Sequence, residues 1–389
     1  MSVRIVRAEY FLVKIPLRIR VEHALASRAA STSGFVVLAD GNGHLGIGEF
    51  ICRDYVTEEK SQDCLEYLND LLRQIKDDQI EDPAKFIQQL WDTSSKRIGQ
   101  QGALCAFELA LLDLWGKQQG KAVAELLRPG VLQVERPVTY SAVYPFASGV
   151  KLTALNVLYR TVVRAESIKM KGNGRIAEDL DYVGGVRRAF GYPVDVRLDL
   201  NGSLSPGHAE EYFSRMAVSP AGVRWIEQPF PKNEWEKSAE FQQRFGKDLI
   251  LCADESICSL EDLARAVTQG AFRAVNIRLA KNGGLLNSLR LYQKAIKSGL
   301  EAQLGCLVGE SSVLSYAGLH FAALADQLRY HEGCFGKYLI KWDAIRPSLT
   351  FSRGGRVPFS RLPEAGLVPV FNVDRLRRQA YESGALGRS

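Results

Sequence analysis

The chain has 389 residues, of which 46% are hydrophobic and 24% charged, and its formal net charge is +6 at pH 7. This length exceeds one ordinary domain and suffices for a large barrel with a smaller partner domain. The positive charge forms no basic run interleaved with aromatic residues, so we expect no nucleic-acid binding. No window approaches the roughly 18–20 apolar residues of a membrane span, and the N-terminus lacks the apolar region of a signal peptide. Seven cysteines without a CxxC motif indicate reduced thiols in a cytoplasmic protein.

The N-terminal part of the chain begins with strand patterns. Apolar residues predict a strand over 3–14, whereas residues 15–32 are polar, follow no clean period and predict a loop. Residues 34–39 and 45–50 flank the turn sequence Asp40-Gly41-Asn42-Gly43, which predicts a hairpin.

Helical patterns follow at about 57–76, 83–96 and 100–118. The last segment is apolar on nearly every side, so we expect it to be buried. Strands and helices together predict an α+β domain over residues 1–130.

After Pro137, short apolar runs alternate with amphipathic segments such as 176–190. The runs are 138–143, 167–171, 194–200, 223–226, 249–253, 274–279, 302–305 and, weakly, 328–331. Strands alternating with helices over about 200 residues predict an α/β fold, a (β/α) barrel over 131–351. A doubly wound open sheet is the alternative, but no glycine-rich phosphate loop follows the first run. Residues 352–389 have no clear barrel role, and we expect them to return to the N-terminal domain.

Acidic residues end three successive strands of this barrel. Asp199, Glu227 and Asp254 each precede a polar, glycine or proline break, and their spacings (227 − 199 = 28, 254 − 227 = 27) place them at one height. A single acid there is usually a helix cap or a surface charge, but three in consecutive units are hard to explain that way. Facing carboxylates resist being ionised together unless a divalent cation is bound. All-oxygen ligation favours Mg²⁺ over zinc, with Mn²⁺ as an alternative.

A pair of lysines ends the preceding strand. Side chains alternate along a strand, so Lys169 and Lys171 point the same way. Two neighbouring ammonium groups lower each other's pKa, which makes a lysine a usable base near neutral pH. Beside a metal that holds a carboxylate substrate, this base would remove the α proton and leave a metal-stabilised enediolate. Solvated lysines on an edge strand are the alternative. A glycosidase would use two strand-end acids, but it needs neither a third acid nor a lysine pair.

These motifs resemble the enolase superfamily, specifically its muconate-lactonizing-enzyme (muconate cycloisomerase) subgroup, over nearly the whole chain. The matching motifs are Lys169-Met-Lys171, Asp199-Leu-Asn201, Glu227-Gln-Pro and Asp254-Glu255-Ser. The resemblance implies a (β/α)7β TIM-like barrel with an α+β N-terminal capping domain, Mg²⁺, and abstraction of a proton α to the carboxylate of a small substrate. It also implies that Lys171 is the base, that Lys169 assists it, and that Asn201 and Glu255 stand beside the metal ligands.

One departure from the subgroup concerns its second acid/base lysine, at the end of the sixth strand. Here that position is Arg278, at the subgroup's interval from Asp254 (278 − 254 = 24), and Lys281 is expected to begin the following helix. Arginine keeps its proton, with a pKa of roughly 12.5–13.8, and is a poor proton shuttle. One-base cycloisomerisation or syn elimination through Lys171 is therefore favoured over two-base epimerisation of dipeptides or N-acyl amino acids, which stays the alternative.

Two other family patterns are missing. The mandelate-racemase arrangement needs a histidine after the seventh strand, where this chain has Gly305-Cys306-Leu307. The Asp-x-Asp of dipeptide epimerases is replaced by Lys341-Trp342-Asp343, which has one acid only.

Loops of the capping domain and the end of the eighth strand are expected to select the substrate. The candidate contacts are His23, Arg28, Arg53, Tyr55 and Glu332. We expect a homo-oligomer. Hypotheses from other classes are a metal-binding barrel without turnover and a hydrolase that uses the acids directly.

Overall fold

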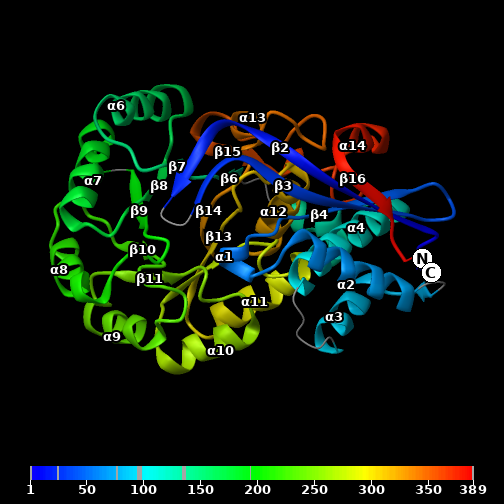
Figure 1. Cartoon of the computed structure of the whole chain (residues 1–389), viewed down its shortest axis with the longest axis horizontal. Coiled ribbons are helices and arrows are strands. Elements are labelled where there is room, and N and C mark those ends of the chain that lie inside the picture. Colours follow the sequence, from blue (N-terminus) through cyan, green and yellow to red (C-terminus); the bar gives the residue numbers. More distant parts are fainter. Residues whose placement is uncertain are drawn as a thin grey trace.

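The computed structural model describes residues 2–23, 26–75, 78–93, 99–133, 137–192 and 194–387. Figure 1 shows a barrel of parallel strands ringed by helices, and beside it a smaller unit in which an antiparallel sheet packs against helices. Both chain ends lie in the smaller unit. No helix of the described residues combines the length and the hydropathy that a membrane span requires.

The sheet of the smaller unit has the strand order β16-β2-β3-β4. Its strands are β2 (Arg7–His23), β3 (Ala26–Ala39), β4 (Leu45–Phe50) and β16 (Ala380–Ala385), and β1 (Val3–Arg4) pairs with β5 (Gln79–Ile80) apart from it. The hairpin predicted between residues 34 and 50 is confirmed. The C-terminal β16 pairs antiparallel with β2, which carries the chain end back to this sheet.

The loop predicted over 15–32 is wrong, because β2 and β3 continue through it as a long hairpin with an irregularity between Pro16 and Val21. Val13, Ile15 and Leu17 are buried in alternation, so the inner face of β2 extends beyond the segment predicted as a strand. Lys14, Pro16 and Arg18 alternate with these residues on β2 and are exposed. The hairpin thereby reaches from the sheet to the mouth of the barrel (Figure 1).

The smaller unit also contains helices, which are α1 (Asp54–Thr57), α2 (Ser61–Gln74), α3 (Pro83–Thr93), α4 (Gln100–Gln119) and α5 (Val123–Leu127). Of these, α4 packs against β3 and β4 of this sheet. The prediction that α4 is buried is confirmed, since nearly all of its side chains are inaccessible. Its backbone lies so close to β4 that a Cβ on Gly48 would fall 1.8 Å from the carbonyl oxygen of Ala106. Glycine is required there because no side chain fits between the strand and the helix.

The larger unit is a sheet of 8 parallel strands in chain order. Its strands are β7 (Ala142–Tyr144), β8 (Ser167–Lys171), β9 (Asp195–Asp199), β10 (Trp225–Glu227), β11 (Ile250–Ala253), β12 (Ala274–Ile277), β13 (Glu301–Leu304) and β14 (Leu328–His331). The sheet closes where the Ser141 N–H donates to the His331 carbonyl at 2.8 Å. Closure places the carboxyl ends of all the strands around one mouth.

Helices connect each strand to the next, which confirms the (β/α)7β barrel with a capping domain. They are α6 (Gly149–Val157, continued by a π-helical turn over Leu158–Val163), α7 (Ile176–Phe190), α8 (Pro206–Ala217), α9 (Trp235–Phe245), α10 (Leu260–Gln269), α11 (Leu285–Lys297) and α12 (Ser312–Leu324). After β14 come the short α13 (Gly336–Leu339) and α14 (Val373–Gln379). The predicted first run, 138–143, is divided: β6 (Pro137–Thr139) pairs with β15 (Arg356–Pro358), and only β7 joins the barrel. The boundaries at residues 130 and 351 stay predictions.

Buried polar contacts join the two units beside the barrel mouth. The Arg53 Nη2 donates to the Val308 carbonyl at 2.6 Å, and the Ser311 hydroxyl donates to the Glu49 carboxylate at 2.6 Å. At the start of α11, the Glu108 carboxylate of α4 accepts the Leu286 N–H at 2.6 Å. The loop after β13 is thus fixed to the capping domain.

We predict that Gly48→Ala lowers the free energy of unfolding by about 1–3 kcal/mol, because a methyl group there overlaps the backbone of α4. Urea titration followed by circular dichroism measures the change. Gly207→Ala on α8 is the matched control, since a Cβ there meets nothing within 4 Å. Equal stability of the Gly48 variant and the wild type would contradict the close approach.

Candidate active site

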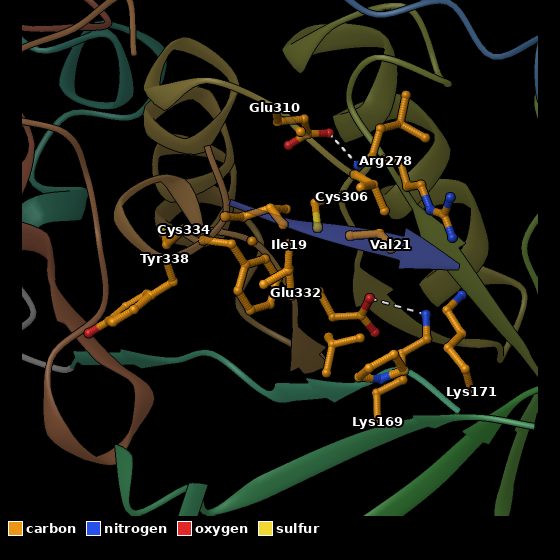
Figure 2. Close-up of a pocket in the computed structure, with 18 of the residues that line it drawn as sticks. Ile19, Val21, Lys169, Lys171, Arg278, Cys306, Glu310, Glu332, Cys334 and Tyr338 are labelled. Carbon is orange, nitrogen blue, oxygen red and sulfur yellow. Dashed lines mark hydrogen bonds and ion pairs between the residues drawn. The ribbon is translucent and has the colours of Figure 1, made fainter. Parts of the chain in front are cut away.

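A pocket opens at the carboxyl ends of the barrel strands, beneath the capping hairpin (Figure 2). Ile19, Arg20 and Val21 of β2 form part of its wall. Its polar floor comes from the strand ends, where Lys169, Lys171, Asn201, Glu255, Arg278 and Glu332 line it. Both units therefore contribute to the pocket.

Lys169 is buried at the centre of the polar floor. Its Nζ lies 2.8 Å from Asp199 Oδ2, 2.7 Å from Glu227 Oε1 and 3.1 Å from Glu332 Oε2. Burial alone would lower the pKa of Lys169, but the surrounding carboxylates outweigh burial and raise that pKa well above its usual value. The lowered pKa expected for Lys169 in a lysine pair is therefore wrong, because three acids surround it.

Lys171 lies one pleat further out, at the edge of the pocket. Its Nζ donates to Asp199 Oδ2 at 2.6 Å and to Asn201 Oδ1 at 2.7 Å. Burial would raise the pKa of Asp199, but the two lysines hold it far below its usual range. The predicted lysine pair thus shares one carboxylate, and the outer lysine faces the pocket.

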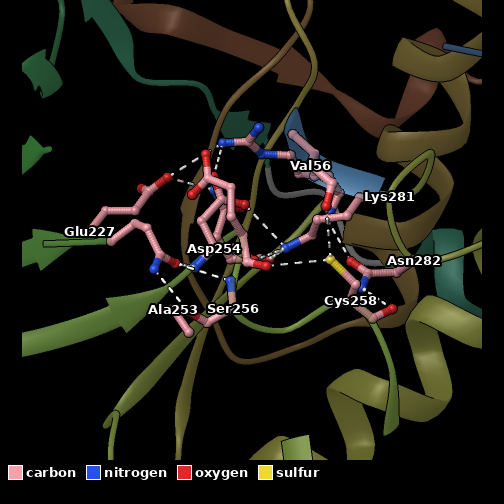
Figure 3. A network of polar contacts seen from close by, with 12 residues as sticks. Val56, Glu227, Ala253, Asp254, Ser256, Cys258, Lys281 and Asn282 are labelled. Atoms are coloured by element: carbon pink, nitrogen blue, oxygen red, sulfur yellow. Dashed lines mark hydrogen bonds and ion pairs between the residues drawn. The ribbon is translucent and has the colours of Figure 1, made fainter. Parts of the chain in front are cut away.

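Asp254, after β11, is held by two cations from the end of β12 (Figure 3). Arg278 Nη2 donates to Asp254 Oδ2 and lies 3.5 Å from Glu227 Oε1. Lys281 Nζ is fully buried and donates to the Asp254 carbonyl at 2.6 Å, to its Oδ1 at 3.1 Å and to the Asn276 carbonyl at 2.8 Å. Lys281 does not begin a helix, since α11 starts at Leu285.

Glu227 stands between these two groups. Asn276 Nδ2 donates to Glu227 Oε1 at 2.8 Å and Gln303 Nε2 donates to its Oε2 at 2.6 Å. Burial raises the pKa of Glu227 to about 8, and the neighbouring Asp199 carboxylate adds to the shift. The crowding of carboxylates inferred from the sequence is thus present at the barrel mouth.

The three predicted ligands Asp199, Glu227 and Asp254 are linked in pairs by protein cations. Within the described part of the chain, no three metal-binding side chains are already gathered around one point, because Lys169 and Arg278 lie between them. Their chemistry nevertheless suits a hard divalent cation, since all the donors are buried carboxylate oxygens. The neighbouring Glu255 Oε2 is also buried and has no hydrogen-bond partner among the described residues. The residues present therefore fit such an ion, which would compete with Lys169 and Arg278.

Glu332 and Arg197 complete the charged floor. Arg197 Nη2 donates to Glu332 Oε1 at 2.8 Å, and both side chains are buried. The sequence interpretation named Glu332 but missed Arg197. Strand alternation could have found it, because Arg197 precedes Asp199 by two residues on β9 and faces the same side.

Two of the other predicted substrate contacts, Arg28 and Arg53, do not line the pocket. Arg28 lies on β3 with its Nη2 4.0 Å from Asp54 Oδ1. Arg53 is buried beside the loop after β13. The side chains of His23 and Tyr55 lie outside the described residues.

The architecture and the charged strand ends define an enzyme-like barrel with its site under a capping domain. The family model described as "Enolase C-terminal domain-like" matches residues 156–367. The chain is 27% identical over 381 residues to N-succinyl-L-Arg/Lys racemase of Bacillus cereus, covering 96% of this chain and 97% of that protein.

Solved structures share the fold. A dipeptide epimerase of Cytophaga hutchinsonii complexed with Mg and D-Ala-L-Val has a TM-score of 0.85 at 20% identity, covering 99% of this chain and 100% of that one. Muconate lactonizing enzyme has a TM-score of 0.82 at 23% identity, covering 97% and 99%. This chain belongs to the enolase superfamily, and it is an enzyme.

We predict that Lys281→Met lowers the free energy of unfolding by roughly 3–5 kcal/mol, because it leaves the buried Asp254 Oδ1 and the carbonyls of Asp254 and Asn276 without the ammonium that donates to all three. Urea denaturation measures the loss. Lys171→Met is the matched comparison: it removes a cation at the pocket edge while Asp199 keeps Lys169. We expect a much smaller loss for that variant. A similar loss in both would show that Lys281 has no special structural role.

Proposed function

We propose that this protein is a Mg²⁺-dependent isomerase or lyase that removes the proton α to a substrate carboxylate. The observation that carries the proposal is the placement of Lys171 at the pocket edge beside three buried carboxylates on successive strands. Asp199, Glu227 and Asp254 would hold the metal. When bound, Mg²⁺ supplies positive charge that stabilises the negative charge developing on the substrate carboxylate.

Lys171 is the proposed base. Its side chain lines the pocket, so in its neutral form its amine would take the α proton of a substrate bound there. Lys169 is more deeply buried and bound by three acids, which suits it to hold charge rather than to exchange protons. Asn201 fixes the position of the Lys171 amine through its side-chain oxygen.

Arg278 lies on the opposite side of the site. In the strand order of the barrel, β12 is four strands from β8 and so half-way around the ring of 8. A guanidinium there stays charged, because burial, which would lower its pKa, is outweighed by Asp254 and the other acids, which raise it well above its usual value. Arg278 would therefore hold an anionic oxygen or the enolate charge, and Lys171 alone would move the proton. Cycloisomerisation or syn elimination fits this one-base arrangement.

Epimerisation is the second candidate, and the comparisons favour it. The relatives reported above include a racemase and an epimerase, which act on an N-succinyl amino acid and a dipeptide by their names. An enzyme that inverts a centre with one base must either turn its substrate or use water on the second face. Inversion of the α carbon distinguishes epimerisation from cycloisomerisation or syn elimination.

We predict that Asp199→Asn, Glu227→Gln and Asp254→Asn each weaken Mg²⁺ binding at least tenfold and abolish turnover. Isothermal titration with Mg²⁺ and with Mn²⁺ measures binding independently of activity. Glu261→Gln on α10, outside the pocket, is the control and should bind as the wild type does. Unchanged affinity in all three site variants would remove the metal assignment.

We predict that Lys171→Ala loses exchange of the substrate α proton with deuterated water. Removing a positioned base typically loses ~10²–10⁴ in rate, which is roughly 3–5 kcal/mol of barrier. Proton NMR of single enantiomers across N-acyl amino acids, dipeptides, sugar acids and muconolactones measures both exchange and inversion.

Arg278→Met should weaken turnover, and Arg278→Lys should gain exchange from the second face. Inversion by the wild type together with exchange by Lys171→Ala would contradict one-base chemistry.

A further inference from the structure

Glu310 is a carboxyl group in the pocket that the proposed proton abstraction does not use. It lies between β13 and α12, and Figure 2 shows it away from Lys169 and Lys171, with Cys306 and Glu332 between. Its side chain accepts one hydrogen bond within the described residues, from the Leu307 N–H at 2.5 Å. No cation of the described residues pairs with it, whereas Glu332 pairs with Lys169 and Arg197.

The loop that carries Glu310 is held rigidly against the capping domain. The Val308 carbonyl accepts the Arg53 Nη2 at 2.6 Å. Gly309 has φ +88°, and a Cβ there would lie 2.4 Å from the Cβ of Ser31. On the other side, Ser311 is bonded to Glu49. The position of Glu310 is therefore fixed before any ligand binds, as a recognition group requires.

The chemistry of the pocket is asymmetric. Cations of Lys169, Lys171 and Arg278 gather at its floor. The space beyond them is walled by Arg20 of the capping hairpin and by apolar side chains, which include Ile19, Val21, Leu307, Val308 and Phe335. Glu310 lines this second part of the pocket, away from Lys169 and Lys171. Withdrawal from water raises the pKa of the Glu310 carboxyl to about 8, although the Leu307 N–H and the more distant charges of Arg278 and Arg53 lower it. A cation in direct contact with Glu310 would favour its charged form further.

We propose that Glu310 selects the substrate by binding a cationic group, an ammonium or a guanidinium, at the side of the pocket away from the reacting carboxylate. This inference rests on the proposed function, which places the substrate carboxylate at the cationic floor. The apolar wall fits an aliphatic spacer between the two charges. The substrate class is thus an amino-acid derivative that carries one carboxylate and one distant cation.

Three matched substrate pairs test the inference. N-acetyl-L-lysine is compared with N-acetyl-L-2-aminoheptanoate, which carries a methyl group in place of the ammonium, and N-acetyl-L-arginine with N-acetyl-L-citrulline. L-Ala-L-norleucine is compared with its N-acetylated form, so that a side-chain cation is distinguished from an α-ammonium. Exchange of the α proton in deuterated water gives kcat and KM for each substrate.

We predict that the wild type favours the cationic member of at least one pair by about 10–100-fold in kcat/KM, the range expected for a hydrogen bond to a charged group. Most of the difference should be in KM, because Glu310 does not touch the reacting carbon. Glu310→Gln should lose the preference while still exchanging the neutral substrate. Glu301→Gln, at the first residue of β13 and outside the pocket, is the matched control and should keep the preference for the cationic substrate.

Each outcome has a separate meaning. Exchange of neutral and cationic members at equal rates by the wild type would overturn the role of Glu310 and leave the proposed function standing. A preference that survives in Glu310→Gln would do the same. Absence of exchange with any substrate of these pairs and of the carboxylate panel would overturn the proposed function, and the inference with it.

Discussion

The ion pairs of Lys169 with Asp199, Glu227 and Glu332 hold the mouth of the barrel together. Burying several carboxylates in one place is unfavourable unless each is paired, and here every acid in contact with Lys169 shares its charge with a neighbouring cation or amide. The neighbouring cations lower the pKa values of Asp199, Asp254 and Glu332 against the effect of burial, whereas burial prevails at Glu227 and raises its pKa to about 8. The same ion pairs also define where a divalent cation would have to compete.

Arg278 stands where the resemblance to the muconate-lactonizing-enzyme subgroup implies an acid/base lysine. A lysine at that position can take and return a proton, whereas a guanidinium bound to Asp254 can only hold charge. The asymmetry between Lys171 on one side and Arg278 on the other follows from a single residue. The same barrel could carry one-base or two-base chemistry, so the residue at this position, and not the fold, selects between these reactions.

The capping domain contributes apolar wall residues and one cation, Arg20, to the pocket. The β2–β3 hairpin brings Ile19 and Val21 over the mouth, and Arg53 fixes the loop after β13 beneath it. Because this loop carries Glu310, the packing of the two units determines the polar contacts available to a substrate.

The sequence by itself determined the barrel, the buried helix α4 and the strand ends that carry Lys169, Lys171, Asp199, Glu227 and Asp254, because periodicity and spacing are local properties of the chain. It failed at β2, where polar outer residues hid a long hairpin, and at Lys281, whose partner Asp254 is on another strand. Only the tertiary structure decided which cation pairs with which acid and that Arg197 belongs to the site. It alone also placed Glu310 at the pocket with no cation of the described residues paired to it. These features depend on contacts between residues distant in the chain, which no local pattern encodes.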